Sequence, residues 1–145
     1  STGTPQVRVV NNNTLKLQVR PGTDTTARQQ LLERWYRRQL KSQLPYLLVH
    51  WEPVIGTIVA ECRIKRMKTR WGSCNIEANR IWLNLELIKK EPVCLEYILV
   101  HEMTHLLERH HTARFCKLMD QFMPDWRVRR DALNAAPLTH EGWDY

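Results

Sequence analysis

The feature that most constrains the fold of this chain is the pentapeptide HEMTH at residues 101–105, which is followed closely by two further histidines. His101 and His105 are four residues apart, so on an α-helix they lie about 40° apart and share one face. Two neutral imidazoles placed in this way can supply half of a tetrahedral metal site. We therefore expect the chain to form a helix whose histidine face meets further ligands.

Glu102 follows the first of these histidines directly. In the H-E-x-x-H arrangement this glutamate is not a ligand, and it takes a proton from water on the metal. The pattern arises by chance in roughly one chain in a hundred of this composition. Here it also lies in a strongly apolar helical stretch that follows Pro92 and runs to about Arg109. We therefore interpret it as a metal site with a catalytic carboxylate. A purely structural site would need a fourth protein ligand and would leave Glu102 without a role.

The third ligand is not determined by helical spacing. On a continuous helix, His110 would lie about 180° from His101 and would face away from the metal. His111 is closer in angle, but it would lie about 9 Å from His105 along the helix axis. A zinc–nitrogen bond is only about 2 Å long, so neither histidine can bind unless the helix ends.

A turn after about Glu108 or Arg109 would allow His111 to reach the metal. Longer zinc-binding motifs with this spacing place glycine at the turn, whereas this chain has Glu108 there. A carboxylate further along, from Asp120 or Asp125, is an alternative third ligand. We favour His111 and keep His110 and these carboxylates as alternatives.

The patterns in the rest of the chain predict an α+β domain. Apolar and polar alternation, turn residues and helical spacing indicate its elements. We expect a hairpin at 6–20 with its turn at 11–13, a basic helix from Thr23 or Asp24 to about Gln43, a second short helix after Pro45, an antiparallel pair formed by 61–74 and 80–87, and helices at 93–109, 112–123 and 125–134.

Composition limits the class of protein. With 145 residues, 43% of them hydrophobic and 26% charged, the chain suits a single domain over 1–145. We expect a hairpin and basic helix over about 6–57, a catalytic core over about 60–134 and an irregular tail over 135–145. Neither a membrane-spanning run nor a secretory signal is visible, and the four cysteines include no C-x-x-C pair. We therefore expect a cytoplasmic protein with reduced thiols and no membrane partner.

Several segments resemble the bacterial YgjP-like metallopeptidases, which are small zincin-type domains related to the SprT-like proteases. The resemblance covers about residues 62–133 and is carried by RMKTRWGSC, LNLELI, YILVHEMTHLLERHHTARF and PDWRVRRDAL. It implies a zincin-like fold in which an antiparallel sheet packs on the HExxH helix, with further helices after it. The family pattern places a third histidine after five intervening residues, followed by a small hydroxyl residue and then Phe. It thus implies that His101, His105 and His111 hold the metal and that Glu102 is the general base.

The resemblance implies a hydrolase that uses Zn²⁺, although the same three histidines would accept other divalent metals. The substrate would be a peptide or an unfolded protein, and we expect it to pair with residues 80–87 as an edge strand. RWGSC, residues 70–74, is the other part of the resemblance. Gly72 there allows a close approach of the backbone, and the segment has no assigned catalytic role.

Two alternatives remain open at this stage. A metal-bound water among arginines and lysines also suits hydrolysis of nucleoside triphosphates, an activity attributed to similar proteins. The net charge of +7 and the basic runs RWYRRQLK and CRIKRMKTR also permit a DNA-associated protease like the SprT-like relatives, and such DNA binding should weaken steeply with salt.

Overall fold

The computed structural model describes residues 5–10 and 14–135, and it divides the chain into two compact units, Ser1–Gln39 and Leu40–Tyr145. Each unit contains helix, and both contain strands, so the predicted α+β class is confirmed. The boundary between the units falls within one helix, and the expectation of a single domain over 1–145 stays a prediction. The predicted hairpin turn at 11–13 and nearly all of the predicted tail lie outside the described residues.

The first unit contains the predicted hairpin. Strands β1 (Gln6–Val10) and β2 (Thr14–Gln18) pair antiparallel, with Val7 opposite Leu17. The helix that follows is capped by Asp24, whose Oδ1 accepts a hydrogen bond of 2.7 Å from the backbone N–H of Ala27.

The expected break at Pro45 is wrong, because helix α1 runs without interruption over Thr25–Ile55. Within the second unit, α1 buries one apolar face that consists of Leu40, Leu44, Trp51 and Ile55. Pro45 lies on the exposed side of the helix. Proline has no N–H to donate to the carbonyl one helical turn earlier, but on this side water can hydrogen-bond to that carbonyl, so the loss costs little. A hydrogen bond of 2.9 Å from Nε1 of Trp51 to Glu96 fixes this half of the helix against the core.

The second unit contains a mixed three-stranded sheet in the order β3-β5-β4, formed by Glu61–Lys65 (β3), Gly72–Asn75 (β4) and Arg80–Asn84 (β5). β4 pairs antiparallel with β5, as predicted, but β3 pairs parallel with β5. The stretch 61–74 is therefore two strands joined by a connection at 66–71, because the chain crosses the end of β5 to reach its other side. β5 is paired on both sides, so the expectation that 80–87 forms an edge strand is wrong.

β5 also ends three residues earlier than the alternating pattern predicts. The Oδ1 atom of Asn84 accepts a hydrogen bond of 3.0 Å from the N–H of Glu86, which starts a short 3-10 helix, η1 (Leu85–Lys89). Leu85 and Leu87 remain buried, so the alternation of apolar residues correctly marked core positions but not the backbone conformation.

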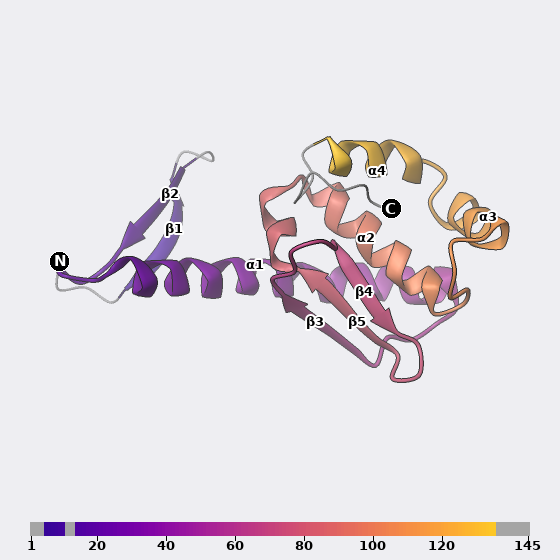
Figure 1. The fold of residues 1–145 in the computed structure, drawn as a ribbon, viewed down its shortest axis with the longest axis horizontal. Helices are drawn as coiled ribbons and strands as arrows, with labels where there is room; N and C mark the ends of the chain where they lie inside the picture. Colours follow the sequence, from indigo (N-terminus) through magenta and orange to yellow (C-terminus); the bar gives the residue numbers. More distant parts are fainter. Residues whose placement is uncertain (1–4, 11–13, 136–145) are drawn as a thin grey trace. The chain divides into compact units, whose positions relative to one another are not determined.

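Helix α2 (Pro92–His105) is the central element of the second unit (Figure 1). It contacts β4 and β5 of the sheet on one side, and it also contacts α3 (Ala113–Phe122) and α4 (Trp126–Asn134). Every residue from Tyr97 to His105 is buried as a result. A helix buried all round needs an apolar surface, so its few polar side chains mark the site. None of the described helices combines the length and the apolar character that a membrane crossing requires.

Candidate metal centre

Three imidazoles converge at the C-terminal end of α2. The Nε2 atoms of His101, His105 and His111 form a triangle with sides of 3.1 Å (His101–His105), 2.9 Å (His105–His111) and 3.1 Å (His111–His101). Tetrahedral zinc with bonds of about 2.0–2.1 Å would hold such nitrogens about 3.3 Å apart. The observed spacing is within about 0.4 Å of that value. Among the described residues these three histidines are the group that could hold a metal ion.

Hydrogen bonds to the opposite ring nitrogens orient two of these imidazoles. Nδ1 of His105 lies 3.0 Å from the backbone carbonyl oxygen of Glu108, to which it can only donate. Nε2 of neutral His105 therefore carries a lone pair directed at the other two histidines. Nδ1 of His101 lies 3.4 Å from the hydroxyl of Tyr97, one helical turn earlier.

The end of α2 determines how His111 reaches the site. The helix was expected to continue to about Arg109, but it ends at His105, and its cap Leu106 donates to the carbonyl of Met103. The chain then turns at Leu106 and Leu107, before the predicted position. Asn79 is the only described non-glycine residue with positive φ, so this turn needs no glycine.

The next helix holds the third histidine in place. Thr112 is the N-cap of α3, and its side chain accepts a hydrogen bond of 3.2 Å from the N–H of Phe115. Phe115 is almost fully buried and packs on all three imidazoles, with ring centroids 4.5 Å from His105, 5.0 Å from His101 and 5.1 Å from His111. His111 and the aromatic ring that packs on all three imidazoles therefore both lie at the start of α3.

The donor set fits a divalent cation. Three neutral imidazoles within 3.1 Å of one another cannot all satisfy their Nε2 atoms by mutual hydrogen bonds, whereas one cation accepts all three lone pairs. Burial, together with the neighbouring imidazoles, holds the pKa of His101 well below its usual value. Burial also lowers the pKa of His105. Both shifts favour the neutral form that binds metal. His111 is exposed, so the site is open to solvent on that side.

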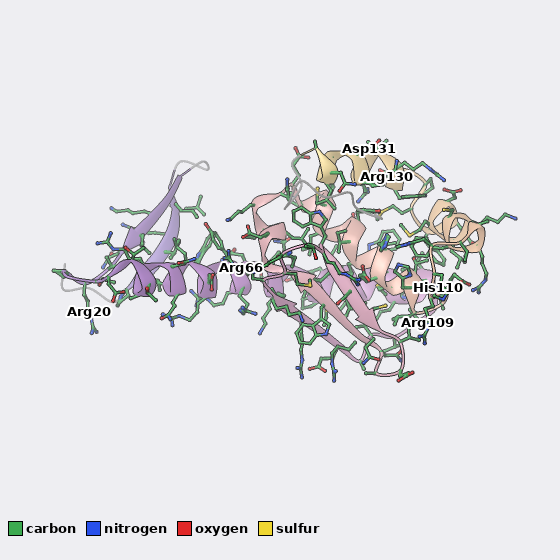
Figure 2. The ribbon with its side chains drawn as sticks, in the orientation of Figure 1. Arg20, Arg66, Arg109, His110, Arg130 and Asp131 are labelled. Carbon is green, nitrogen blue, oxygen red and sulfur yellow. The ribbon has the colours of Figure 1, made fainter. Side chains whose placement is uncertain are left out.

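The alternative ligands lie elsewhere. His110 is exposed next to Arg109, in the segment between α2 and α3 (Figure 2). The carboxylate of Asp120 accepts hydrogen bonds from Nε1 of Trp126 and from Arg127, and Asp125 pairs with Arg129. These three side chains do not join the histidine group.

Glu102 is buried on α2 against the first residue of β4. A Cβ atom built on Gly72 would lie 2.8 Å from Cγ2 of Ile98, 3.0 Å from Cγ of Glu102 and 3.2 Å from its Oε2. Only glycine therefore leaves room for this carboxylate, in agreement with the close backbone approach expected at Gly72. Burial raises the pKa of the Glu102 carboxyl to about 8 in the metal-free protein, and the charge of Arg70 opposes the shift.

Residues outside the motif also contribute to the site, and the sequence signals for them were weak. Tyr97 lies four residues before His101, a spacing that places both on one helix face, but aromatic residues at this spacing are usually core. Its ring also stacks on Trp126 of α4, at a centroid distance of 6.4 Å. The backbone carbonyl of Glu108, which orients His105, reaches its position through the turn after α2. No side-chain pattern in the sequence predicts that contact.

Comparison with known proteins is consistent with this geometry. Residues 2–136 match the model of a family described as YgjP-like, metallopeptidase domain. No protein of the curated set matches this chain. The fold is similar to the crystal structure of the metallopeptidase zymogen of Pyrococcus abyssi abylysin, with 22% sequence identity and a TM-score of 0.54 over 63% of this chain and 89% of that one. That likeness concerns the fold alone. Because the family match spans nearly the whole chain, the protein belongs to the YgjP-like family of metallopeptidase domains and is a metal-dependent hydrolase.

Proposed function

We propose that the protein is a zinc-dependent peptidase in which His101, His105 and His111 bind the metal and Glu102 is the general base. The observation that carries the proposal is the convergence of three Nε2 atoms, with the buried Glu102 directly after His101 on the same helix. Zn²⁺ is the usual metal of three imidazoles, and Ni²⁺, Co²⁺ or Mn²⁺ would fit the same donors less commonly. Exposure of His111 supports a catalytic rather than a closed structural site, because solvent can reach the histidine group from that side.

The chemistry needs an activated water and a base beside it. A bound Zn²⁺ supplies Lewis-acid activation of the water and of the scissile carbonyl. Glu102, which follows His101 on the same buried helix, removes a proton from the attacking water and delivers it to the departing amine. Gly72 leaves the carboxylate room to lie at this position, and Phe115 keeps the three imidazoles oriented.

The peptide would bind along β4. This strand is at one edge of the sheet, contacts α2 and carries Gly72 against Glu102. A peptide that adds to a sheet edge gains main-chain hydrogen bonds without requiring particular side chains. Such pairing suits a substrate that is extended, as an unfolded protein is.

The test is hydrolysis of fluorescently labelled casein by the zinc-loaded protein and by Glu102→Gln. General acid–base catalysis contributes about 10²–10⁴-fold, so Glu102→Gln should lose at least about 100-fold in kcat. Metal content measured by mass spectrometry should stay at one ion per chain. Glu77→Gln, an exposed change of the same chemistry in the turn between β4 and β5, is the matched control and should keep full activity. Hydrolysis that survives in zinc-loaded Glu102→Gln would contradict the proposal.

The nucleoside triphosphate and DNA alternatives stay predictions. On the outer face of the sheet, Arg63 and Lys65 lie over the ring of Trp82, and Glu61 forms ion pairs with Arg63 and Arg80. Part of the basic charge is thus neutralised within the protein. Phosphate release from ATP and a DNA mobility shift at low salt, each with and without chelator, separate these alternatives from casein hydrolysis.

A further inference from the structure

Arg70 and Trp71, just before β4, have no role in the chemistry described so far, yet the chain leading into them is held firmly. The connection 66–71 crosses the end of β5, where the buried side chain of Asn84 holds it. Nδ2 of Asn84 donates to the carbonyl of Met67 at 2.8 Å and to that of Arg70 at 2.7 Å. The backbone N–H of Asn84 donates to the carbonyl of Trp71 at 2.9 Å. Asn84, the last residue of β5, thus fixes the main chain at Arg70.

The residues after Arg70 connect this backbone to the base. The indole of Trp71 is buried, with 1% of its surface exposed, and Lys90 lies over its ring. Gly72 then packs directly against Glu102. Since Arg70 is two residues before Gly72 and its carbonyl is held by Asn84, its side chain starts close to the general base.

The guanidinium of Arg70 is exposed and available. The main chain of Arg70 is held by Asn84 two residues before the contact of Gly72 with Glu102, so an arginine side chain at this position is long enough to reach the space beside the carboxylate. Arg66, in the same connection, is paired with Glu86 at 3.0 Å, whereas within the described part of the chain Arg70 has no carboxylate partner.

We propose that Arg70 is a further catalytic residue, whose guanidinium stabilises the oxyanion that forms on the scissile carbonyl during peptide hydrolysis. The inference rests on the proposed peptidase function and deepens it. An arginine suits this task because it stays charged at every working pH and presents several N–H donors in a fixed plane. The oxyanion forms only as the reaction proceeds, so a cation beside it stabilises the transition state more than the bound substrate.

Arg70 neither gains nor loses a proton in the proposed reaction. The oxygen of water forms a bond to the carbonyl carbon, the π pair of the carbonyl moves to its oxygen, and Glu102 takes one proton from the water. Arg70 donates hydrogen bonds to the new oxyanion and keeps all of its protons. When the oxyanion pair re-forms the carbonyl, the C–N bond breaks and the amine leaves with the proton from Glu102.

The test compares Arg70→Ala and Arg70→Lys with Lys68→Ala, all in the full zinc-loaded chain. Lys68→Ala removes the same charge from an exposed position of the same connection. One oxyanion donor is worth about 10²–10³-fold in kcat, so Arg70→Ala should lose that much on labelled casein with KM changed less than about threefold. Arg70→Lys should recover part of the loss, and Lys68→Ala should match the wild type.

A second measurement does not depend on turnover. A phosphinic peptide, in which a PO₂⁻–CH₂ group replaces the scissile amide, resembles the tetrahedral anion, whereas acetohydroxamate probes only an intact metal site. By calorimetry, Arg70→Ala should weaken binding of the phosphinic peptide about as much as it lowers kcat/KM, with acetohydroxamate binding unchanged. A structural role of Arg70 would weaken both ligands.

The outcomes separate the two proposals. If wild-type protein does not cleave casein, both the peptidase function and this role of Arg70 fall. If the wild type is active, three results overturn only the assignment of Arg70: Arg70→Ala keeps kcat, it raises KM alone as a group that binds a substrate carboxylate would, or it leaves binding of the phosphinic peptide unchanged.

Discussion

His110 and His111 are neighbours in the sequence with different surroundings. The Nε2 atom of His111 meets those of His101 and His105, whereas the ring of His110 lies in solvent outside this group. We expect His111→Ala to weaken zinc binding by at least about 100-fold, because it removes one of the three protein ligands that we propose. His110→Ala should bind zinc as the wild type does. Competition with a fluorescent zinc chelator measures both affinities, and equal losses in the two variants would contradict the ligand assignment.

The buried carboxyl of Glu102 should make the stability of the metal-free protein depend on pH. Its pKa rises from 4.5 to about 8 on folding, so the native state holds a proton that the unfolded chain has released. This contribution is complete below pH 4.5 and is lost as pH rises through about 8. Between pH 6.5 and 8 we expect the unfolding free energy to fall by about 1.5 kcal/mol from this group.

Urea unfolding in the presence of a chelator measures this effect, and Glu102→Gln is its control. The variant has no ionisable group at position 102, so its stability should change less over the same pH range. The range begins at pH 6.5 because His101 and His105, whose pKa values are lowered by burial, would add an opposite dependence in more acidic solution. Equal slopes for both proteins would contradict the prediction.

At the residue scale, the sequence predicted those features of the site that depend on residues close together in the chain. Spacing placed His101 and His105 on one face, and the order of residues marked Glu102 as the base that we propose. His111 required the family resemblance, because its position depends on a turn that helical geometry cannot predict. The sequence analysis assigned no catalytic role to Arg70, because the relation that we propose between Arg70 and Glu102 arises from a strand crossing and from the contact at Gly72, which are long-range features.

At the scale of elements, the start of α3 links helix stability to the third histidine. Thr112 caps this helix directly after His111, and Thr112→Ala should destabilise the protein by about 1 kcal/mol. The same change should weaken zinc binding severalfold, because the backbone at His111 becomes less fixed. Thr112→Ser keeps the hydroxyl and should preserve both properties. Thermal unfolding and zinc titration measure the two effects. Full zinc affinity in a destabilised Thr112→Ala would contradict the prediction that the cap contributes to zinc binding.

Element boundaries were predicted less well than element types, for identifiable reasons. Proline is a local signal for a break, but the buried face of α1 continues past Pro45 and keeps the helix intact. Alternation in 80–87 continued beyond the strand because η1 also buries Leu85 and Leu87. The parallel pairing of β3 with β5 could not be derived, since pairing partners depend on the path of the connection 66–71.

At the scale of the whole molecule, metal binding should raise stability by mass action, because the three histidines that we propose as ligands meet only in the folded chain. Free zinc at about 100 times its Kd would add about 2.7 kcal/mol. For a chain of this size that corresponds to a rise of about 5–10 °C in Tm. Differential scanning fluorimetry with increasing zinc measures the shift, and His101→Ala, which lacks one ligand, should show little of it. A wild-type Tm that does not depend on zinc would contradict a site formed by folding.

The contact between Gly72 and Glu102 also limits how this protein can diverge. The wall against the Glu102 side chain is main chain at position 72, so a side chain added there would require Ile98 and Glu102 to shift. Selection for new substrates, in nature or by directed evolution, therefore meets a strong steric barrier at this position. Variation in specificity is expected instead in the remaining residues of β4, the strand along which we propose that the peptide binds, and in the segment between α2 and α3, which carries His111.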